Sequence, residues 1–596
     1  MKKPSLVEIF FKNDEQRKAN EAAMKSGFFS RQFSGSVTKQ LKRIRSTRLV
    51  RLISAISHLF SHVSTKVYGT LFLAFGVAGI MIYLLRLSVD GSITTPIVGA
   101  IFAVLSIPFL FVDKTLPAFI SDFKITDYLF YEIFCMKRHT SETIAKFPIL
   151  ISVCIGIGLA ALSVLVPFWQ IAVGIGIFIC AYVGIESPEF IFLASLFSLP
   201  YIRFIPHGQF WLVAAILFGL ASFLLKVLIG KRVIYIEQYD IFIGIMLVFL
   251  LISGIFVKGE ESFMGSLVMI ALSVGYILAG NIVTNQRLAE RSVNAVVISC
   301  VISALVSFIQ LTVYAIKSPG EILRNLSLIF VRQDGIAVFL IAGLILAVAM
   351  IKQSAGISRK AYIISAVLLS LAMILSGEFF AVFAVFLGML VYYILKNKLR
   401  PGFFLPLLLI SPLALLLLPN LVLDFVFYLS PSIESAEGLF DLWYKSLSVW
   451  SNNIFVGIGI GSESFLEEMS ALGINGYPDS SNLFIELGLE AGVFALISFF
   501  CILFARMKHR SIQYLYVRNS QIERLSCVSG ACTFGLLAFG MINYIWSEPS
   551  AYYFFWCLFG IGSATLRIAK KDYDDKVVYY EESNAFDSSV IDIEIG

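Results

Sequence analysis

Charged residues are scarce in this sequence. Asp, Glu, Lys and Arg together make up 14% of its 596 residues, whereas hydrophobic residues make up 58%. Soluble domains carry about 25% charged and about 45–50% apolar residues, so this composition excludes an ordinary soluble protein. Many separate apolar runs reach the ~17–25 residues that one spanning helix needs. The sequence therefore predicts an all-α, polytopic transmembrane helical bundle of about 12–16 spans.

Cysteine and histidine are also sparse, so few side chains could form disulfides or bind a metal ion. The eight cysteines fall mostly inside apolar runs, so we expect small buried side chains and neither a disulfide framework nor a metal set. Among the five histidines, His58 and His62 have a spacing that can hold a metal, but no third ligand is evident. We expect no metal and no cofactor. The net charge is +6, and the positive charges are unevenly spread along the chain. This uneven spread predicts the orientation of the helices in the membrane, and we expect no nucleic-acid partner.

The first residues lack the apolar core that a signal peptide places within about the first 15–30 positions. Residues 1–66 hold fourteen Lys or Arg against four acids. From Gln40 to Lys66, basic and apolar residues mix in a pattern typical of an amphipathic helix on the lipids of an anionic leaflet. An arm that docks partner proteins is the alternative.

Basic clusters between the apolar runs predict the orientation of the chain. When the N-terminus is placed in the cytoplasm, every such cluster falls inside, as the positive-inside rule requires, and both termini are cytoplasmic. The same alternation puts residues 419–486 outside, where nine acids accompany one base, Lys445. The predicted organisation is a cytoplasmic basic arm with an amphipathic helix (1–66), a transmembrane helical region (67–418), a large external loop (419–486), the last three transmembrane helices (487–566), and an acidic cytoplasmic tail (567–596).

Three segments carry a family resemblance. Residues 450–465 read WSNNIFVGIGIGSESF, residues 479–492 read DSSNLFIELGLEAG, and residues 325–335 read NLSLIFVRQDG. Their order and spacing, across about residues 230–566, resemble those of the O-antigen ligase and O-antigen polymerase family, in which a glycine-rich entrance and an asparagine-containing exit bound the large external loop.

The resemblance implies a metal-independent membrane glycosyltransferase of the polysaccharide polymerase or ligase type. It would transfer a glycan from a polyprenyl-diphosphate carrier to an acceptor glycan or lipid, at the outer face of the cytoplasmic (inner) membrane of a bacterium. Glycan-synthesis proteins would be partners of the basic arm. An inactive relative that scaffolds polysaccharide assembly, or a lipid-linked glycan transporter, is the alternative.

Two positions depart from the family pattern. The family has histidine where this chain has Ser481, although the following Asn482 is retained. The family also has arginine within a serine-arginine-glycine, where the comparable place here reads Ser376-Gly377-Glu378. Either other groups perform the transfer, or the chain is an inactive relative.

A pyrophosphate leaving group is multiply anionic, so a metal-free transferase needs arginine or lysine at its external mouth. Arg332 is the first candidate because it closely precedes a predicted span, and Arg203 is a second. Both also fit interfacial anchors, whose charged heads reach the headgroup region. The other candidates for substrate binding are Lys445, Ser481 and Asn482.

An acceptor hydroxyl needs a general base. The candidates are Glu378 and Glu490, which lie at the ends of predicted spans, and His207, the one histidine predicted to be external. Glu490 also matches a family glutamate whose role can be structural. The glycines at 457, 459 and 461 permit either a phosphate cradle of backbone N–H groups or a packing turn.

Overall fold

The computed structural model describes residues 63–86, 94–122, 124–128, 148–162, 166–229, 232, 234–237, 239–257, 260–317, 336–352, 354–376, 378–396, 436–472, 477–513 and 520–569. Throughout these ranges the regular structure is helical, apart from one isolated bridge between Ser64 and Thr115. The all-α prediction is therefore confirmed for the described ranges. The basic arm up to residue 62, Arg332 and the tail from residue 570 lie outside them.

Within the described ranges, eight helices are long and apolar enough to cross a membrane, which makes the chain a multi-pass membrane protein. They run over Thr65–Leu85, Phe168–Glu186, Gly208–Val227, Glu261–Ile282, Gln286–Gln310, Gly356–Leu375, Leu483–Lys508 and Gln521–Phe539. Shorter apolar helices lie at Thr95–Phe111, Ile149–Ala161, Pro188–Ile202, Asp240–Phe256, Ile336–Ile351 and Phe380–Lys396. The count of 12–16 spans stays a prediction.

The chain divides into two compact units. Unit 1 takes in residues up to Glu186 together with Ser222–Val233, and unit 2 takes in Ser187–Ala221 and everything from Ile234 onward. Unit 1 contains α5 (Thr65–Arg86), α6 (Thr94–Phe111), α7 (Leu116–Asp122), α8 (Lys124–Asp127), α9 (Ile149–Ala161) and α10 (Phe168–Glu186). Helix α12 (Gly208–Ile229) contributes to both units.

In unit 1, small residues let α5 approach α6 and α9 closely. A Cβ atom added to Gly76 would lie 2.5 Å from the carbonyl oxygen of Gly99, and one added to Gly156 would lie 2.6 Å from that of Leu71. Lipid tails are as apolar as these side chains, so helix association in a bilayer depends on such close packing. Phe75 and Phe168 stack with ring centroids 4.6 Å apart and join α10 to the same core.

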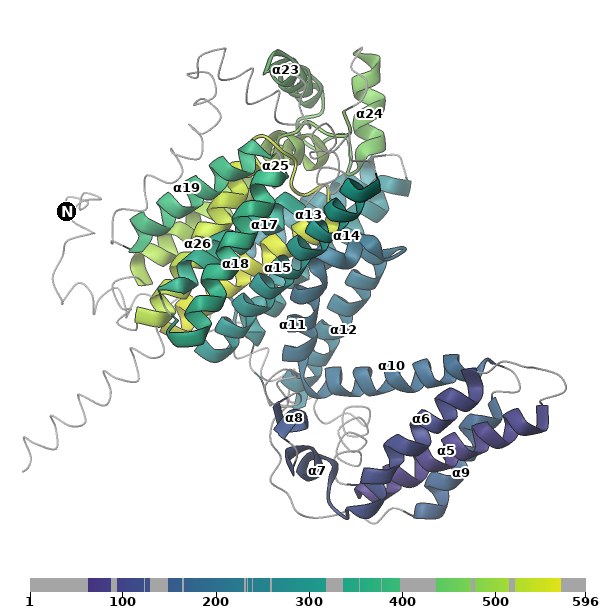
Figure 1. Ribbon diagram of the computed structural model, residues 1–596. Coiled ribbons are helices and arrows are strands. Elements are labelled where there is room, and N and C mark those ends of the chain that lie inside the picture. Colours follow the sequence, from purple (N-terminus) through teal and green to yellow (C-terminus); the bar gives the residue numbers. More distant parts are fainter. Residues whose placement is uncertain are drawn as a thin grey trace, which may run out of the picture. The chain divides into compact units, whose positions relative to one another are not determined.

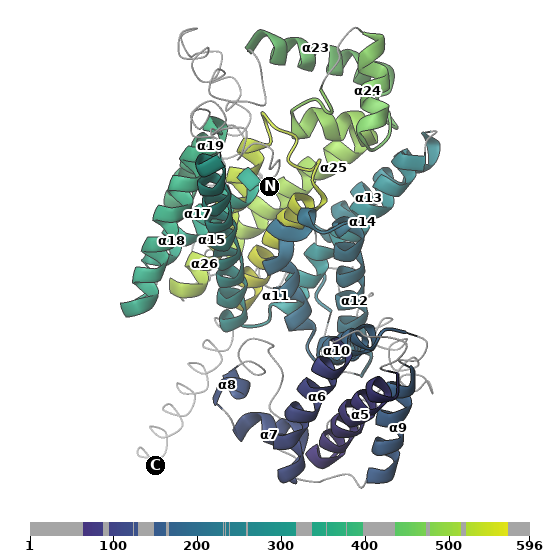
Figure 2. The ribbon, with the colours of Figure 1, turned by 45° about the vertical axis from the view of Figure 1, so that its right-hand side comes forward.

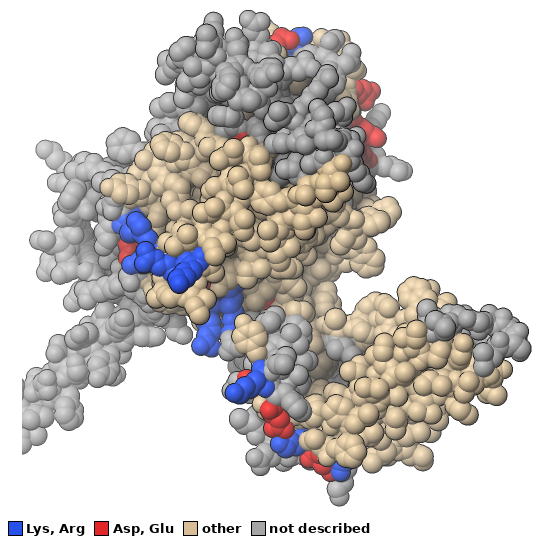
Figure 3. Space-filling view, in the orientation of Figure 1, with Lys and Arg blue, Asp and Glu red and all other residues tan. Residues whose placement is uncertain are grey.

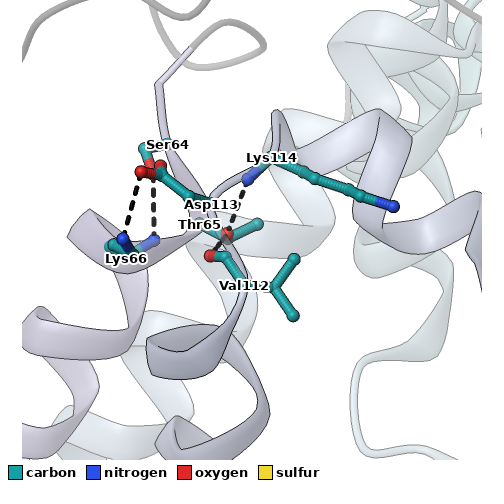
Figure 4. A network of polar contacts seen from close by, with 6 residues as sticks. All are labelled: Ser64, Thr65, Lys66, Val112, Asp113 and Lys114. Carbon is teal, nitrogen blue, oxygen red and sulfur yellow. Dashed lines mark hydrogen bonds and ion pairs between the residues drawn. The ribbon is translucent and has the colours of Figure 1, made fainter.

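A polar network ties the start of α5 to the end of α6 (Figure 4). The Ser64 hydroxyl donates to Asp113 Oδ1 at 2.6 Å, and Lys66 Nζ lies 3.1 Å from Asp113 Oδ2. Thr65 Oγ1 donates to the carbonyl oxygen of Val112 at 2.5 Å. The hydrogen bonds from Ser64 and Lys66 lower the pKa of the Asp113 carboxyl below its usual range.

Unit 2 is a larger helical bundle (Figures 1 and 2). Its elements are α11 (Pro188–Ser198), η3 (Leu199–Phe204), α13 (Asp240–Phe256), α14 (Glu260–Ile282), α15 (Gln286–Lys317), α17 (Ile336–Ile351), α18 (Gly356–Leu375), α19 (Phe379–Lys396), α23 (Ala436–Asn452), α24 (Ser462–Ala471), α25 (Leu483–Gln513) and α26 (Ser520–Phe539). A further helix covers residues 549–569. Nearly all of its side chains are buried, including Tyr552, Phe555 and Trp556, so this helix forms the centre of the bundle.

Charged residues of unit 2 gather at two ends of the helices. In Figure 3 the flanks of the helices carry almost no charged residues, whereas blue and red atoms gather toward the ends. We call one end the basic end, where Arg524 Nη1 donates to the carbonyl oxygen of Lys352 at 3.3 Å. Its other members are Arg359, Lys360 and Lys396, at the start of α18 and the end of α19. The opposite end, with α23, α24 and the start of α25, is the acidic end.

Candidate functional site at the start of helix α25

The start of α25 is fixed by an asparagine cap. Asn482 Oδ1 accepts hydrogen bonds from the amides of Phe484 and Ile485 at 3.0 and 3.2 Å, because the first amides of a helix have no partner within it. Its Nδ2 group donates to the carbonyl oxygen of Met541 at 2.8 Å. Asn482 thus joins α25 to the segment 540–548 that follows α26.

Helix α25 breaks one third of the way along, at Gly492. This residue has φ 78° and ψ 175°, a conformation that is essentially restricted to glycine. A Cβ atom there would overlap the backbone of Phe455, and the next amide, of Val493, donates to the carbonyl oxygen of Ile454 at 2.7 Å. The break therefore lets the glycine-rich loop at 453–461 lie directly against the helix backbone.

This loop also depends on Gly457, whose φ is 81° and whose Cβ would overlap the carbonyl oxygen of Leu489. The amide of Ile458 donates to that same oxygen at 2.7 Å, and the amide of Ile460 donates to Ser262 Oγ at 3.0 Å. These amides are used within the protein. The glycines at 457, 459 and 461 were expected to form either a phosphate cradle or a packing turn, and the structure fits the packing turn.

Two carboxylates lie buried where the loop meets α25. Glu490 is 3% exposed: its Oε2 accepts from the hydroxyl of Tyr544 at 2.6 Å, and its Oε1 accepts from the amide of Gly461 at 3.4 Å. Glu486 is 2% exposed, and its Oε2 accepts from the amide of Ser480 at 2.8 Å. All of these donors are neutral. No lysine or arginine in the described ranges forms an ion pair with either carboxylate.

Tyr544 lies in the segment 540–548, outside the helices that can span a membrane. Burial raises the pKa of its phenol well above the ordinary value, and the nearby carboxylates Glu490 and Glu486 raise it further. The phenol therefore keeps its proton and acts as a hydrogen-bond donor that orients Glu490. The Ser253 hydroxyl on α13 donates to the backbone carbonyl of Glu490 and fixes the residue from the other side.

Helices α23 and α24 lie beside the start of α25 in both ribbon views (Figures 1 and 2). An apolar cluster joins the three: Leu442, Val449, Ile458, Phe465, Met469 and Leu489 are all buried in it. The Trp450 ring lies so close to Gly488 that a Cβ there would be 2.8 Å from Trp450 Cε2. The acidic end thus has a folded cover of two helices, where the sequence predicted only a loop.

The structure brings three of the predicted site residues together. Ser481, Asn482 and Glu490 lie on or directly before the first turns of α25, and Tyr544 approaches them from the segment 540–548. Ser481 has a positive φ of 50°, and its amide donates to Asp479 Oδ1 at 2.8 Å. Asn482 uses both of its side-chain groups within the protein.

The remaining predicted residues lie elsewhere in the chain. His207 precedes α12, is exposed and has φ 55°. Glu378 lies between α18 and α19, where its amide donates to Ser376 Oγ at 3.4 Å. Lys445 on α23 pairs with Asp441 at 3.0 Å. The backbone of Arg203 belongs to η3, and Arg332 lies outside the described ranges.

Sequence reasoning missed Tyr544 and Ser253. They are 54 and 237 positions from Glu490, so no local motif links them to it. The available signal was the polar and aromatic break at 540–548 between two apolar runs. At membrane depth, irregular backbone is tolerated only where it is buried in protein or lines a cavity, so such a break predicts that its residues contact other segments.

Together, the site offers two buried carboxylates held by neutral donors on a broken, capped helix. A carboxylate in this state can accept a proton from a bound hydroxyl group. Among the described residues, no group of three or more His, Cys, Asp or Glu side chains is arranged to hold a metal ion.

Fold and site define a multi-pass helical membrane protein with a carboxylate site at one end of its larger unit. No protein-family model matches the chain, and no curated protein sequence matches it either. The resemblance of the loop segments to the O-antigen ligase and polymerase family therefore stays a prediction from the sequence.

Proposed function

We propose that this protein is a membrane glycosyltransferase of the polysaccharide polymerase or ligase type. It transfers a glycan from a polyprenyl-diphosphate carrier to an acceptor glycan or lipid at the outer face of a bacterial cytoplasmic membrane. One observation supports this most: the two family-like segments at 450–465 and 479–492, which are bridged by hydrogen bonds, meet around the buried carboxylate of Glu490.

In the proposed reaction, Glu490 is the general base. An acceptor hydroxyl loses its proton to the carboxylate as its oxygen bonds to the anomeric carbon, and the bond from that carbon to the diphosphate oxygen breaks. The electron pair of that bond leaves with the diphosphate. Because the hydroxyl attacks from the face opposite the leaving group, this single displacement inverts the configuration. Tyr544 positions the base, and Arg332 and Arg203 are the proposed contacts of the diphosphate. The acidic end would face outward and the basic end the cytoplasm.

A deletion strain tests this proposal through mass spectrometry of its polyprenyl-diphosphate-linked glycans. We expect a single repeat unit to accumulate while long polymer or the ligated product is lost. Wild type and the control Glu467→Gln, an exposed glutamate on α24, should restore the product, whereas Glu490→Gln and Arg332→Ala should not. Glu378→Gln asks whether the second predicted base is needed. An unchanged lipid-linked pool in the deletion strain would overturn the transferase.

Transport of a lipid-linked glycan is a second candidate, because Glu486 and Glu490 are buried in a helix that can span the membrane. Ionisable groups in such positions often mark substrate or proton pathways. The two functions separate in vitro. A transferase, purified and mixed with the lipid-linked glycan and acceptor, forms the new glycosidic bond, whereas a transporter only moves the glycan between leaflets of a vesicle.

A further inference from the structure

Helix α23 carries three buried hydrogen-bond donors that have no hydrogen-bond partner among the described residues. They are Trp443 Nε1, Ser446 Oγ and Trp450 Nε1. Their spacing of three and four residues places them on one face of the helix, one above the other. We call these three groups the donor row.

Buried polar atoms are hydrogen-bonded in the great majority of cases, and each exception needs an explanation. Other polar side chains of α23 do have partners: Ser451 Oγ donates to the carbonyl oxygen of Ser448 at 2.7 Å, and Lys445 pairs with Asp441. Among the buried polar atoms of α23 in the described part of the chain, the three of the row are the ones without a partner. A ligand rich in oxygen acceptors would complete it.

We propose that the donor row binds the hydroxyl and ring oxygens of an uncharged sugar of the glycan substrate. This rests on the proposed function and names a subsite for it. The indole N–H groups and the Ser446 hydroxyl donate to sugar oxygens, while the apolar faces of the tryptophans pack on sugar C–H groups.

The charges around the row favour a neutral ligand over a phosphate. All three donors are uncharged, and the one base of α23, Lys445, is already paired. The neighbouring helix α24 exposes Glu463, Glu467 and Glu468, whose charges repel an anion. A diphosphate is bound by arginine or lysine, which the row lacks.

The row also lies at the level of the reacting group along α25. Trp450 packs against Gly488, which lies between Glu486 and Glu490 in the sequence. A sugar held on α23 is therefore positioned within about one helical turn of the proposed base. The three donor atoms are buried, so binding requires α23 to shift on α25.

The test uses the full-length protein in lipid nanodiscs. Its probe is the phosphate-free oligosaccharide pool that mild acid releases from the polyprenyl-linked glycans of the host, and inorganic pyrophosphate is the anionic comparison. Binding is followed by tryptophan fluorescence, since two of the donors are indoles. The variants are Ser446→Ala, Trp450→Phe and Trp443→Phe, and the matched control is Ser451→Ala on the exposed face.

We expect the oligosaccharides to shift the emission, with Kd raised at least tenfold by Ser446→Ala and by each Trp→Phe change, and unchanged by Ser451→Ala. The ligand-free Ser446→Ala protein should unfold at the same or a higher temperature, because a buried unpaired hydroxyl is removed. A lower unfolding temperature for Ser446→Ala would overturn the proposal by showing that its hydroxyl has a partner. So would an unchanged Kd, or a weakened affinity for pyrophosphate alone.

This outcome is separable from that of the proposed function. Suppose that oligosaccharide binding depends on the donor row but the lipid-linked pool of the deletion strain is unchanged. This result would support the sugar site and contradict the proposed transferase. An altered pool, together with normal binding by Ser446→Ala, would keep the transferase and remove the row.

Discussion

The two ends of unit 2 differ in whether a buried cation takes part in the packing. At the basic end, Arg567 Nη2 donates to the carbonyl oxygens of Gly280 and Val283 at 2.5 and 3.4 Å, and its guanidinium lies 4.1 Å from the ring centroid of Tyr235. Tyr276 donates to Asp240 Oδ1 at 2.5 Å nearby. At the acidic end, the carboxylates of α25 meet only neutral donors.

This difference suggests that the basic end stabilises the fold, whereas the acidic end holds the functional site. At the basic end, a cation covers the last carbonyls of α14, which carry the negative end of the helix dipole, so the contact stabilises the helix end directly. At the acidic end, no lysine or arginine of the described ranges pairs with the buried carboxylates, and α23 keeps donors without a described partner. Features that cost stability without an evident compensation are expected at functional sites.

The largest change in stability should come from Gly492→Ala, which disturbs the backbone geometry of the acidic end. The φ of this residue belongs to glycine, and the added Cβ would overlap Phe455, so we expect a loss of ~3 kcal/mol or more in the free energy of unfolding. Gly244→Ala on α13 is the control: nothing lies within 4 Å of its Cβ, so it should stabilise by about 0.5–1 kcal/mol. Denaturant titration in detergent measures both, and equal effects would mean that the break is not needed.

Next in size is Arg567→Met at the basic end. It removes charge-assisted hydrogen bonds to Gly280 and Val283, so we expect a loss of about 2–3 kcal/mol of stability, with transfer per folded molecule unchanged. Lys508→Met, an exposed base at the end of α25, should leave stability as it was. A loss of transfer without a loss of stability would contradict the structural role of this end.

A smaller effect on stability is expected for Tyr544→Phe at the acidic end. The change removes one hydrogen bond to Glu490, worth about 1 kcal/mol, but leaves the ring packing intact. The rate of glycan transfer per folded molecule should also fall, because the base Glu490 loses the hydrogen bond that orients it. Tyr444→Phe on the exposed face of α23, where the side chain is 74% exposed, is the matched control. If Tyr544→Phe and Tyr444→Phe transferred glycan at the same rate, Tyr544 would have no role in the reaction.

The smallest effect concerns pH and unit 1. The folded pKa of Asp113 is lowered by Ser64 and Lys66, so its contribution to stability is complete above the unfolded value near ~3.9 and is lost as the pH falls through the folded pKa. Asp113→Asn should therefore lower the unfolding temperature slightly at neutral pH, and the difference from wild type should vanish in strong acid. A difference that persists in strong acid would mean that packing, and not charge, is responsible.

The sequence predicted part of the site. Glu490 and Asn482 could be selected together as candidates because they belong to one short segment, which becomes the first turns of one helix. The predicted bases Glu378 and His207 lie in other connections between helices, since nothing local distinguishes one polar span end from another. Tyr544 was missed because its contact with Glu490 is made by tertiary packing alone.

By itself, the sequence determined that this is an all-helical, multi-pass membrane protein, because apolar runs of sufficient length have no other stable form in a bilayer. Only the tertiary structure decided which polar residues share an end, where Gly492 breaks α25 and which donors on α23 remain unpaired. The reason is physical: hydropathy is a property of each segment, whereas a hydrogen bond between residues far apart in the chain exists only after the helices have packed.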